Sequence, residues 1–262
     1  MLPGALNPAF DPKLLSRIED AGLNASAPPQ QRWIDGWLVR FSPGKAKRAR
    51  CINAVAEGRS SVQHRLRECA AVFDQAGLPM IVRITPFSLP AGLETALEAQ
   101  GLRPFDDTRV MVLAQWPAAD LSLPGGIAIS SIGLEAFAQR VGMFRESPLA
   151  QRQAHAERLL NSPVPYFAFE LRDHGHVVAC GQFALESDLV GLYDIYTAPH
   201  ARGRGLAAWL CRYLLNQAAQ RGARHAYLQV ESDNLPARAV YARIGFVDGY
   251  AYHYRTANPV AA

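Results

Sequence analysis

A glycine-rich segment at residues 199–207 holds the residue types best suited to bind an anion: Pro-His-Ala-Arg-Gly-Arg-Gly-Leu-Ala. It follows an apolar, aromatic run at 190–197 and leads into apolar residues at helical spacing from Leu206 to Ala218. Glycines let the backbone approach a ligand closely, and the free N–H groups of a first helical turn attract negative charge. We therefore predict a phosphate-binding turn between a strand and the N-terminus of a helix.

The same spacing, Gly203-x-Gly205-x-x-Ala208, also fits a dinucleotide-binding fingerprint, and Glu231 ends the next predicted strand. A doubly wound dinucleotide domain carries that fingerprint at its first strand and needs several β-α units after it. Here antiparallel hairpins are predicted before the turn, and only 57 residues follow Gly205. No Gly-Lys-Ser/Thr is present, which excludes a Walker-type loop.

The chain after residue 127 alternates between strand and helix patterns. Strands are expected at 127–131, 166–172, 177–185, 189–197, 226–230 and 246–255, the last as a strand or a hairpin. Helices are expected at 133–144, 149–160, 206–221 and 236–244, and glycines close the last two. The order is antiparallel strands, then helix, strand, helix, strand.

The first half of the chain ends in the same order. A helix at 61–76 stops at Gly77, a strand follows at 80–85, a helix at 90–100 stops at Gly101, and a strand follows at 108–113. Gly77 and Gly222 are 145 residues apart, and Gly101 and Gly245 are 144 apart. This recurrence indicates a duplication of domain size; the alternative is chance, because helix–Gly–strand is a common order.

The first copy lacks a glycine turn before its helix at 61–76, so only the second copy would keep a phosphate site. Pro and Gly concentrate at 115–126, between two patterned regions. We expect a degenerate domain over 1–118, a linker over 119–126 and a second domain over 127–262.

Three features together resemble the GNAT superfamily of acetyl-CoA-dependent N-acetyltransferases. They are the strand and turn that end in Arg202-x-x-Gly205-x-Ala207, the segment Asn234-x-x-Ala237-x-x-Val240-Tyr241 with Gly245-Phe246 after it, and the order of elements. The superfamily's pyrophosphate loop, Gln/Arg-x-x-Gly-x-Gly/Ala, is matched without a gap. The resemblance implies a tandem α/β (α+β) protein of two GNAT-like domains, each a mixed, mostly antiparallel sheet flanked by helices.

The resemblance also implies roles for individual residues. The coenzyme A pyrophosphate would be held by the amides of Arg202, Gly203, Arg204, Gly205, Leu206 and Ala207, and the two arginines would add charge. The pantetheine arm would pair with the edge formed by Ile195, Tyr196 and Thr197, in a slot left where strands 190–197 and 225–230 splay. A backbone N–H near Tyr196 or Thr197 would stabilise the oxyanion.

Tyr241 matches the family's general acid, which protonates the departing thiolate; the alternative is an aromatic ring packed on the core. Asn234 matches a position that contacts the coenzyme or caps the helix after it, and both readings can hold.

The sequence does not identify the general base. An attacking ammonium must lose a proton, and many family members use a glutamate on the strand before the loop. Here that neighbourhood reads Tyr193-Asp194, two residues that strand alternation would point to opposite faces. Asp194 and Glu231 are the candidate bases, either of which could be a structural acceptor instead, and His253 is a weaker one.

Composition limits the partners and the compartment. The content of 49% apolar and 19% charged residues is typical of a folded protein. No apolar run in the sequence reaches 18 residues, so no membrane span is expected. The start of the chain lacks a signal-peptide pattern, and the four cysteines form no C-x-x-C pair, so we expect reduced thiols, no metal and a cytoplasmic protein. The net charge of +4 suits an anionic ligand but does not indicate nucleic acid.

The only basic run of the first half, residues 45–50, is interpreted as solvated charges on a strand. Trp33 and Trp37 flank Asp35-Gly36, which predicts a turn with packed aromatic rings.

We predict an N-acetyltransferase that moves acetyl from acetyl-CoA to a primary amine of a small molecule or amino acid by direct attack in a ternary complex. The alternatives are a protein or peptide N-acetyltransferase and a non-catalytic regulatory module that binds acyl-CoA. The expected partner is a small-molecule amine, with no nucleic acid and no membrane. A homodimer is left open.

Overall fold

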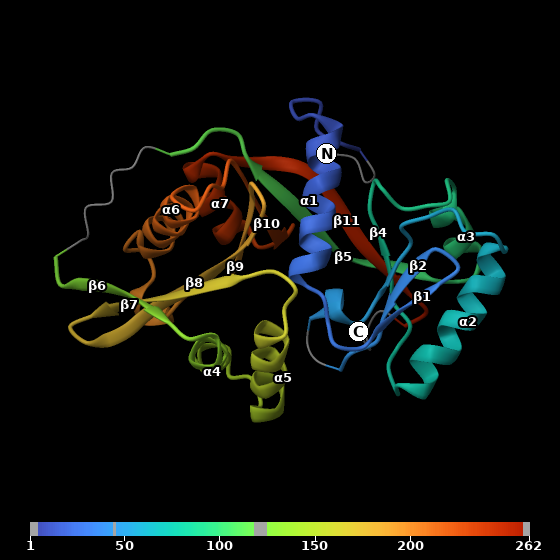
Figure 1. Ribbon diagram of the computed structural model, residues 1–262, viewed down its shortest axis with the longest axis horizontal. Helices are drawn as coiled ribbons and strands as arrows, with labels where there is room; N and C mark the ends of the chain where they lie inside the picture. Colours follow the sequence, from blue (N-terminus) through green and yellow to red (C-terminus); the bar gives the residue numbers. More distant parts are fainter. Residues whose placement is uncertain (1–4, 44–45, 118–124, 259–262) are drawn as a thin grey trace.

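The computed structural model describes residues 5–43, 46–117 and 125–258. These residues form an 11-stranded sheet in the order β1-β2-β3-β4-β11-β5-β10-β9-β8-β7-β6, with helices on both faces (Figure 1). The first half contains α1 (Pro12–Ala25), β1 (Gln31–Ile34), β2 (Trp37–Arg40), β3 (Ile52–Asn53), α2 (Val62–Gln75), β4 (Val82–Ile84), α3 (Leu93–Ala99) and β5 (Arg103–Leu113). The second half contains β6 (Ile127–Ile132), α4 (Leu134–Phe144), α5 (Leu149–Leu160), β7 (Tyr166–Asp173), β8 (His176–Glu186), β9 (Leu189–Thr197), α6 (Leu206–Ala219), β10 (His225–Glu231), α7 (Leu235–Ile244) and β11 (Phe246–Thr256).

The middle of the sheet is buried on both faces. Along β5, Val110 and Val112 join the core beneath α1, α4 and α5, whereas Met111 and Leu113 join the core beneath α6 and α7. A third core lies in the first half, where α2 and α3 pack on β2, β3 and β4. Because successive side chains of a strand point to opposite faces, a strand covered on both sides needs a continuous apolar run such as this one.

The second half follows the sequence prediction closely. Each predicted strand and helix after residue 127 is present, with bounds that differ by a few residues at most. Helix α6 ends at Ala219, before the predicted stop at Gly222. Helix α7 ends at Ile244, and Gly245, with a φ of 109°, caps it as predicted. The final segment is one strand rather than a hairpin.

The first half contains elements that the sequence analysis did not predict. Helix α1 starts at Pro12, after Asp11 accepts a hydrogen bond from the Lys13 backbone N–H. It buries Leu15 and Ile18 against the sheet. Helix α3 begins at Leu93, three residues later than expected.

Strands β1 and β2 form a hairpin around the predicted turn at Asp35-Gly36, where φ is 39° and 83°. Only one of the two flanking rings is packed as predicted: Trp37 is fully buried, whereas Trp33 is 64% exposed.

The interpretation of residues 45–50 as solvated strand charges is wrong for the described residues 46–50. They include a short 3₁₀ helix, Lys47–Ala49, and not a strand. Lys47 pairs with Asp106 at 2.6 Å, and the Arg48 guanidinium donates to Gln229 and Tyr252 in the second half. Lys45 lies outside the described residues.

The two halves repeat one order of elements and share strands. The parallel pair β3–β4 brackets α2, as the parallel pair β9–β10 brackets α6. Strand β11 lies between β4 and β5, and β5 lies between β11 and β10, so what the sequence predicts as two sheets is joined into one. The repeated order supports the duplication, which stays a prediction, as does the division at 118 and 127; residues 118–124 of the expected linker lie outside the described residues.

None of the helices in the described ranges is long and apolar enough to cross a membrane.

A buried ion pair ties α1 to the sheet. The Arg83 guanidinium donates two hydrogen bonds to the Glu19 carboxylate, which also accepts one from the Tyr250 hydroxyl at 2.7 Å. The Arg83 and Glu19 side chains are 3% and 9% exposed. Burial alone would raise the pKa of Glu19, but the charge and hydrogen bonds of Arg83 and the Tyr250 hydroxyl outweigh it and hold the pKa below 4.5.

Replacing Arg83 with Met should lower the free energy of unfolding by about 3–5 kcal/mol, because it leaves the Glu19 carboxylate buried without its cation. Glu19 has a depressed pKa in the folded state, so its stabilising contribution is present above its unfolded pKa of about 4.3 and is lost as the pH falls below it. Urea denaturation of R83M at pH 7 measures the first effect. R59M, which removes an exposed arginine, is the control and should be unchanged; equal stability of R83M would contradict the prediction.

Candidate active site

A β-bulge in β9 sets the position of the candidate site. Tyr193 lies opposite Gln182 and Tyr196 opposite Cys180, so β9 has one residue more than β8 over this stretch. Asp194 takes up the excess with a φ of 51°. Gly181 makes room across the strand pair, since a Cβ there would lie 2.6 Å from the Ile195 side chain.

The bulge corrects the expectation that Tyr193 and Asp194 point to opposite faces. Tyr193 packs with Tyr166 in the core beneath α4 and α5, and Asp194 contacts residues of those same two helices. Regular alternation fails here because the extra residue of a bulge interrupts the two-residue period of the strand.

Asp194 lies at the centre of a polar cluster. Its carboxylate accepts hydrogen bonds from Arg145, at the end of α4, and from the Gln182 amide, both at 2.8 Å. Nε2 of His155, on α5, lies 3.3 Å from Oδ2 of Asp194. Burial alone would raise the pKa of Asp194, but contact with His155 and the charge of Arg145 outweigh it and hold the pKa well below its usual range. Asp194 is therefore ionised at neutral pH.

Strands β9 and β10 stop pairing beside this cluster. Their parallel register runs from Leu189 opposite His225 to Leu192 opposite Leu228. Beyond that point β9 continues to Thr197 along β8, and β10 continues to Glu231 along β5. The two strands thus diverge where the resemblance implies a slot.

Tyr241 belongs to the same electrostatic environment. It lies on α7, where its ring packs edge-on against Phe246 at 6.2 Å. Burial raises the pKa of the Tyr241 hydroxyl, Cys211 and the Asp194 charge raise it further, and the Arg145 charge opposes them. The hydroxyl makes no hydrogen bond within the described ranges. It stays protonated at neutral pH and is available to donate.

The glycine turn lies between β9 and α6 as predicted. Gly203 and Gly205 have φ angles of 77° and 75°, which favour glycine, and a Cβ on either would meet no atom within 4 Å. Gly205 is the N-cap of α6 and supplies no side-chain acceptor, so the N–H groups of the first turn, Leu206 to Ala208, are left without a capping side chain. An uncapped N-terminus beside an open glycine turn can accept an anion.

The two arginines of the turn differ in their contacts. Nε of Arg202 donates to the Thr197 carbonyl at 3.3 Å, and its guanidinium lies 5.9 Å from the centre of the Tyr196 ring. Arg204 donates to the Asp173 carboxylate at 2.7 Å. The carboxylate offsets the charge of Arg204, so Arg202 is the better placed of the two to attract a phosphate.

The structure does not bring every candidate into the cluster. Asn234 caps α7 by accepting a hydrogen bond from the Ala237 N–H at 3.3 Å, so of its two expected roles the helix cap is present. Glu231 is exposed at the end of β10, opposite Thr108, and none of the contacts among described residues links it to Asp194. His253 lies opposite Ile84 of the first half, with Nε2 2.8 Å from Glu94.

Sequence analysis missed His155 and Arg145. A signal was available for His155, because on the predicted helix it lies next to Ala156 and one turn before Leu159, both apolar and buried. A polar residue on an apolar stripe needs a partner inside the fold, but the sequence does not show which strand that stripe meets.

Among the described residues, no group of three or more His, Cys, Asp or Glu side chains is placed to hold a metal ion.

The carboxyl carbon of Asp194 should titrate with an apparent pKa well below 3.8 when followed by ¹³C NMR, because Arg145 and His155 stabilise the carboxylate. R145M should raise that pKa, and R212M, which removes an exposed arginine of α6, should leave it unchanged. A pKa at or above 3.8 in the unaltered protein would show that Asp194 is not held as an anion.

Comparison with known proteins agrees with this geometry. Residues 135–246 match the acetyltransferase (GNAT) family. YobR, an uncharacterized N-acetyltransferase of Bacillus subtilis (strain 168), is 28% identical over 233 residues, which cover 86% of this chain and 91% of that protein.

Two solved structures share the fold. A GCN5-related N-acetyltransferase from Kribbella flavida has a TM-score of 0.68 at 16% identity, with 93% of this chain and 95% of that chain covered. A tandem GNAT protein from the clavulanic acid biosynthesis pathway has a TM-score of 0.59 at 14% identity, with 75% of this chain and 70% of that chain covered. Residues 135–246 of the chain, which include Asp194, the glycine turn and Tyr241, therefore belong to the GNAT family of acetyltransferases.

Proposed function

We propose that this protein transfers an acetyl group from acetyl-CoA to the primary amine of a small molecule or amino acid, by direct attack in a ternary complex. The observation that carries the proposal is the divergence of β9 and β10, which has the glycine turn at one end and Asp194 and His155 beside it; the charge of Asp194 also acts on the pKa of Tyr241. The same place thus offers an anion site and groups that can move protons.

The turn fits the pyrophosphate of coenzyme A. The uncapped N–H groups of Leu206 and Ala207 and the open backbone at Gly203 and Gly205 can donate to phosphate oxygens, and Arg202 adds positive charge. Beyond Leu192, β9 has no strand partner on the side of β10, so Ile195, Tyr196 and Thr197 can pair with the amides of the pantetheine arm. The bound thioester supplies an activated acetyl carbonyl.

Tyr241 is suited to protonate the departing thiolate. Burial keeps its hydroxyl protonated, and no partner among the described residues occupies that hydroxyl. Its place on α7, near the charges of Arg145 and Asp194, supports the role of general acid that the resemblance implies.

His155 replaces Asp194 as the better candidate for the general base. The Asp194 carboxylate has a depressed pKa and accepts hydrogen bonds from Arg145 and the Gln182 amide, so it takes up a proton poorly. Nε2 of His155 lies 3.3 Å from Oδ2 of Asp194, so Nδ1 is the ring nitrogen proposed to accept the proton of the amine. Asp194 then acts as the positioning residue for this imidazole, and Glu231 stays an alternative base.

The charges around the cluster favour an acceptor that carries a carboxylate beside its amine. Arg145 pairs with Asp194 at 2.8 Å, and the charge of Arg158 also lowers the pKa of that carboxylate. The Arg145 side chain is 39% exposed and can reach a bound ligand. An amino acid meets this description, whereas a peptide acceptor is left as the alternative.

Replacing Tyr241 with Phe should lower kcat for acetyl transfer ten-fold or more with little change in the affinity for acetyl-CoA, because only proton donation to the leaving group is lost. Thiol release with a panel of amines, amino acids and short peptides measures kcat, and calorimetry measures coenzyme binding. Y213F is the control, since Tyr213 stacks on Trp209 of α6. An unchanged kcat would remove Tyr241 as the acid, and turnover on peptides alone would replace the small-molecule acceptor.

Replacing His155 with Ala should lower kcat about 100-fold at pH 7, the usual contribution of a general base. Added imidazole should restore part of the activity, and so should a rise in pH toward the pKa of the acceptor amine, because a neutral amine needs no base. H176A, at the exposed start of β8, is the control. A loss at pH 7 that neither imidazole nor high pH relieves would indicate a structural role for His155.

A further inference from the structure

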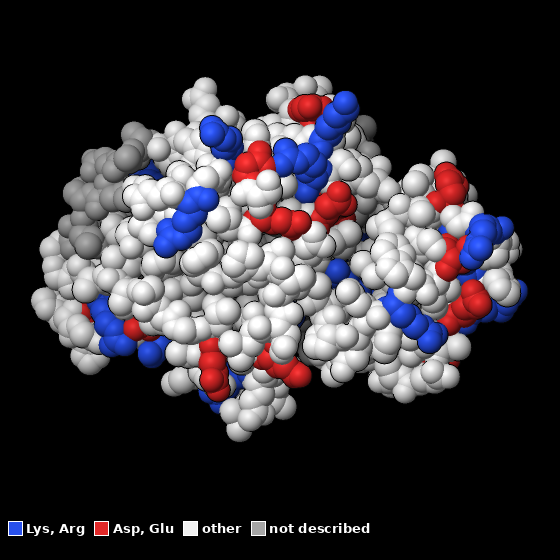
Figure 2. All heavy atoms as spheres, viewed as in Figure 1, with Lys and Arg blue, Asp and Glu red and all other residues white. Residues whose placement is uncertain are grey.

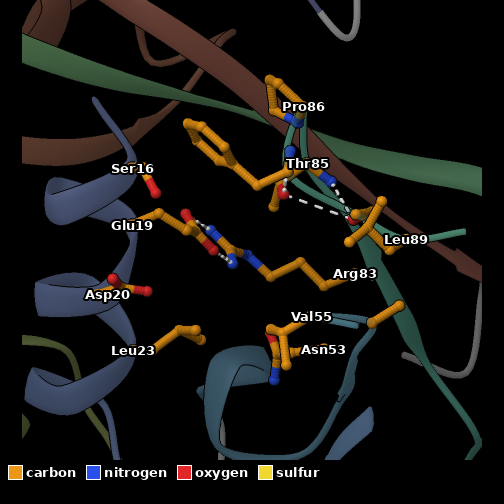
Figure 3. Close-up of a pocket in the computed structure, with 13 residues that line it drawn as sticks. Ser16, Glu19, Asp20, Leu23, Asn53, Val55, Arg83, Thr85, Pro86 and Leu89 are labelled. Atoms are coloured by element: carbon orange, nitrogen blue, oxygen red, sulfur yellow. Dashed lines mark hydrogen bonds and ion pairs between the residues drawn. The ribbon is translucent and has the colours of Figure 1, made fainter. Parts of the chain in front are cut away.

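A second cavity lies in the first half, away from the residues of the proposed acetyl-transfer site. It has a volume of about 310 Å³ and lies between α1 and the ends of β3 and β4 (Figure 3). Its lining residues are Ser16, Glu19, Asp20 and Leu23 of α1, Asn53 of β3 with Ala54 and Val55 after it, and Arg83 of β4 with Thr85 to Leu89 after that strand. This volume is sufficient for a small organic ligand.

The cavity forms for a topological reason. The parallel pair β3–β4 is in register at Ile52 opposite Val82 and at Asn53 opposite Arg83, and the chains then separate to line the two sides of the cavity. A crevice at the carboxyl ends of parallel strands is a common place for ligands in α/β proteins. The divergence of β9 and β10 is the corresponding place in the second half.

The charge that the cavity offers to a ligand is negative. The Glu19 carboxylate is neutralised by Arg83 and also accepts from Tyr250, so neither member of that pair needs a ligand. Asp20, the next residue of α1, has no hydrogen-bond or ion-pair partner within the described ranges. Burial, Glu19 and Glu186 raise the pKa of Asp20, which indicates that no cation of the protein compensates it. Figure 2 shows several carboxylates near α1, in the middle of this face.

Apolar side chains line the rest of the cavity. Leu23, Val55 and Phe87 supply these walls. Figure 3 shows Asn53 across the cavity from Asp20 and Leu23 of α1, but its amide nitrogen is enclosed by the fold, so Asn53 is part of the wall and not a contact for a ligand.

We propose that this cavity binds a small organic ammonium ion that carries an apolar body. Asp20 pairs with the ammonium group, and the apolar body lies against Leu23, Val55 and Phe87. The site needs no acetyl-CoA and is separate from the proposed acetyl-transfer site.

Phenylalaninol is a suitable probe, because it has an ammonium group and an aromatic ring. Its neutral counterpart is the phenylpropanediol in which a hydroxyl replaces the amine. The full chain, labelled with ¹³C in its Leu and Val methyl groups, is titrated with each compound in the absence of acetyl-CoA. Leu23 and Val55 report on the cavity, and Leu235, exposed on α7, reports on the second half.

Phenylalaninol should shift the Leu23 and Val55 methyl signals saturably and leave Leu235 unchanged, and the diol should bind at least ten-fold more weakly. D20N should weaken binding of phenylalaninol at least ten-fold, whereas D74N, which removes an exposed carboxylate of α2, should not. Equal binding of amine and diol, an unaffected D20N, or shifts confined to Leu235 would overturn the proposal. The comparison of the two compounds needs only the unaltered chain, so it decides the question even where D20N does not fold. Loss of acetyl transfer in Y241F or H155A has no bearing on it.

Discussion

The candidate active site depends on the point at which two parallel strands stop pairing. Beyond Leu192, strand β9 keeps β8 as a partner but loses β10, so one edge of its backbone is left without a strand partner in the middle of a wide sheet. Backbone N–H and C=O groups in such a place need a partner. A ligand with amide groups can supply it, and the bulge at Asp194, two residues beyond Leu192, places that carboxylate against Arg145 and His155.

Much of the second half is predictable because its signals are local. The glycine turn, the Asn234 cap and the closing Gly245 each act within a few residues of where they occur in the sequence. His155 and Arg145 were not predictable in the same way, since their role depends on which strand two helices cover. The bulge was missed because strand alternation was assumed to continue through Asp194, although the extra residue can be seen only against the partner strand.

The first half shows the opposite balance. Helix α1 has an N-cap at Asp11 and buried apolar residues at helical spacing, so its existence could have been predicted from the sequence. Its position could not, because it is fixed by the contact of Glu19 with Arg83 and Tyr250, residues 64 and 231 positions away. Likewise, Arg48 reads as a surface charge in sequence but donates to Gln229, 181 positions later.

Each half of the chain places one strand among the strands of the other half: β5 lies between β11 and β10, and β11 lies between β4 and β5. Strand β5 lies between β10 and β11, so a chain that began after it would have two long neighbouring strands with nothing between them. Exposed edges of this kind promote association with other chains. The second half therefore needs the first half for strand β5, whether or not the first half binds a ligand. The sequence of the first half is free to acquire another binding specificity while its place in the sheet stays fixed.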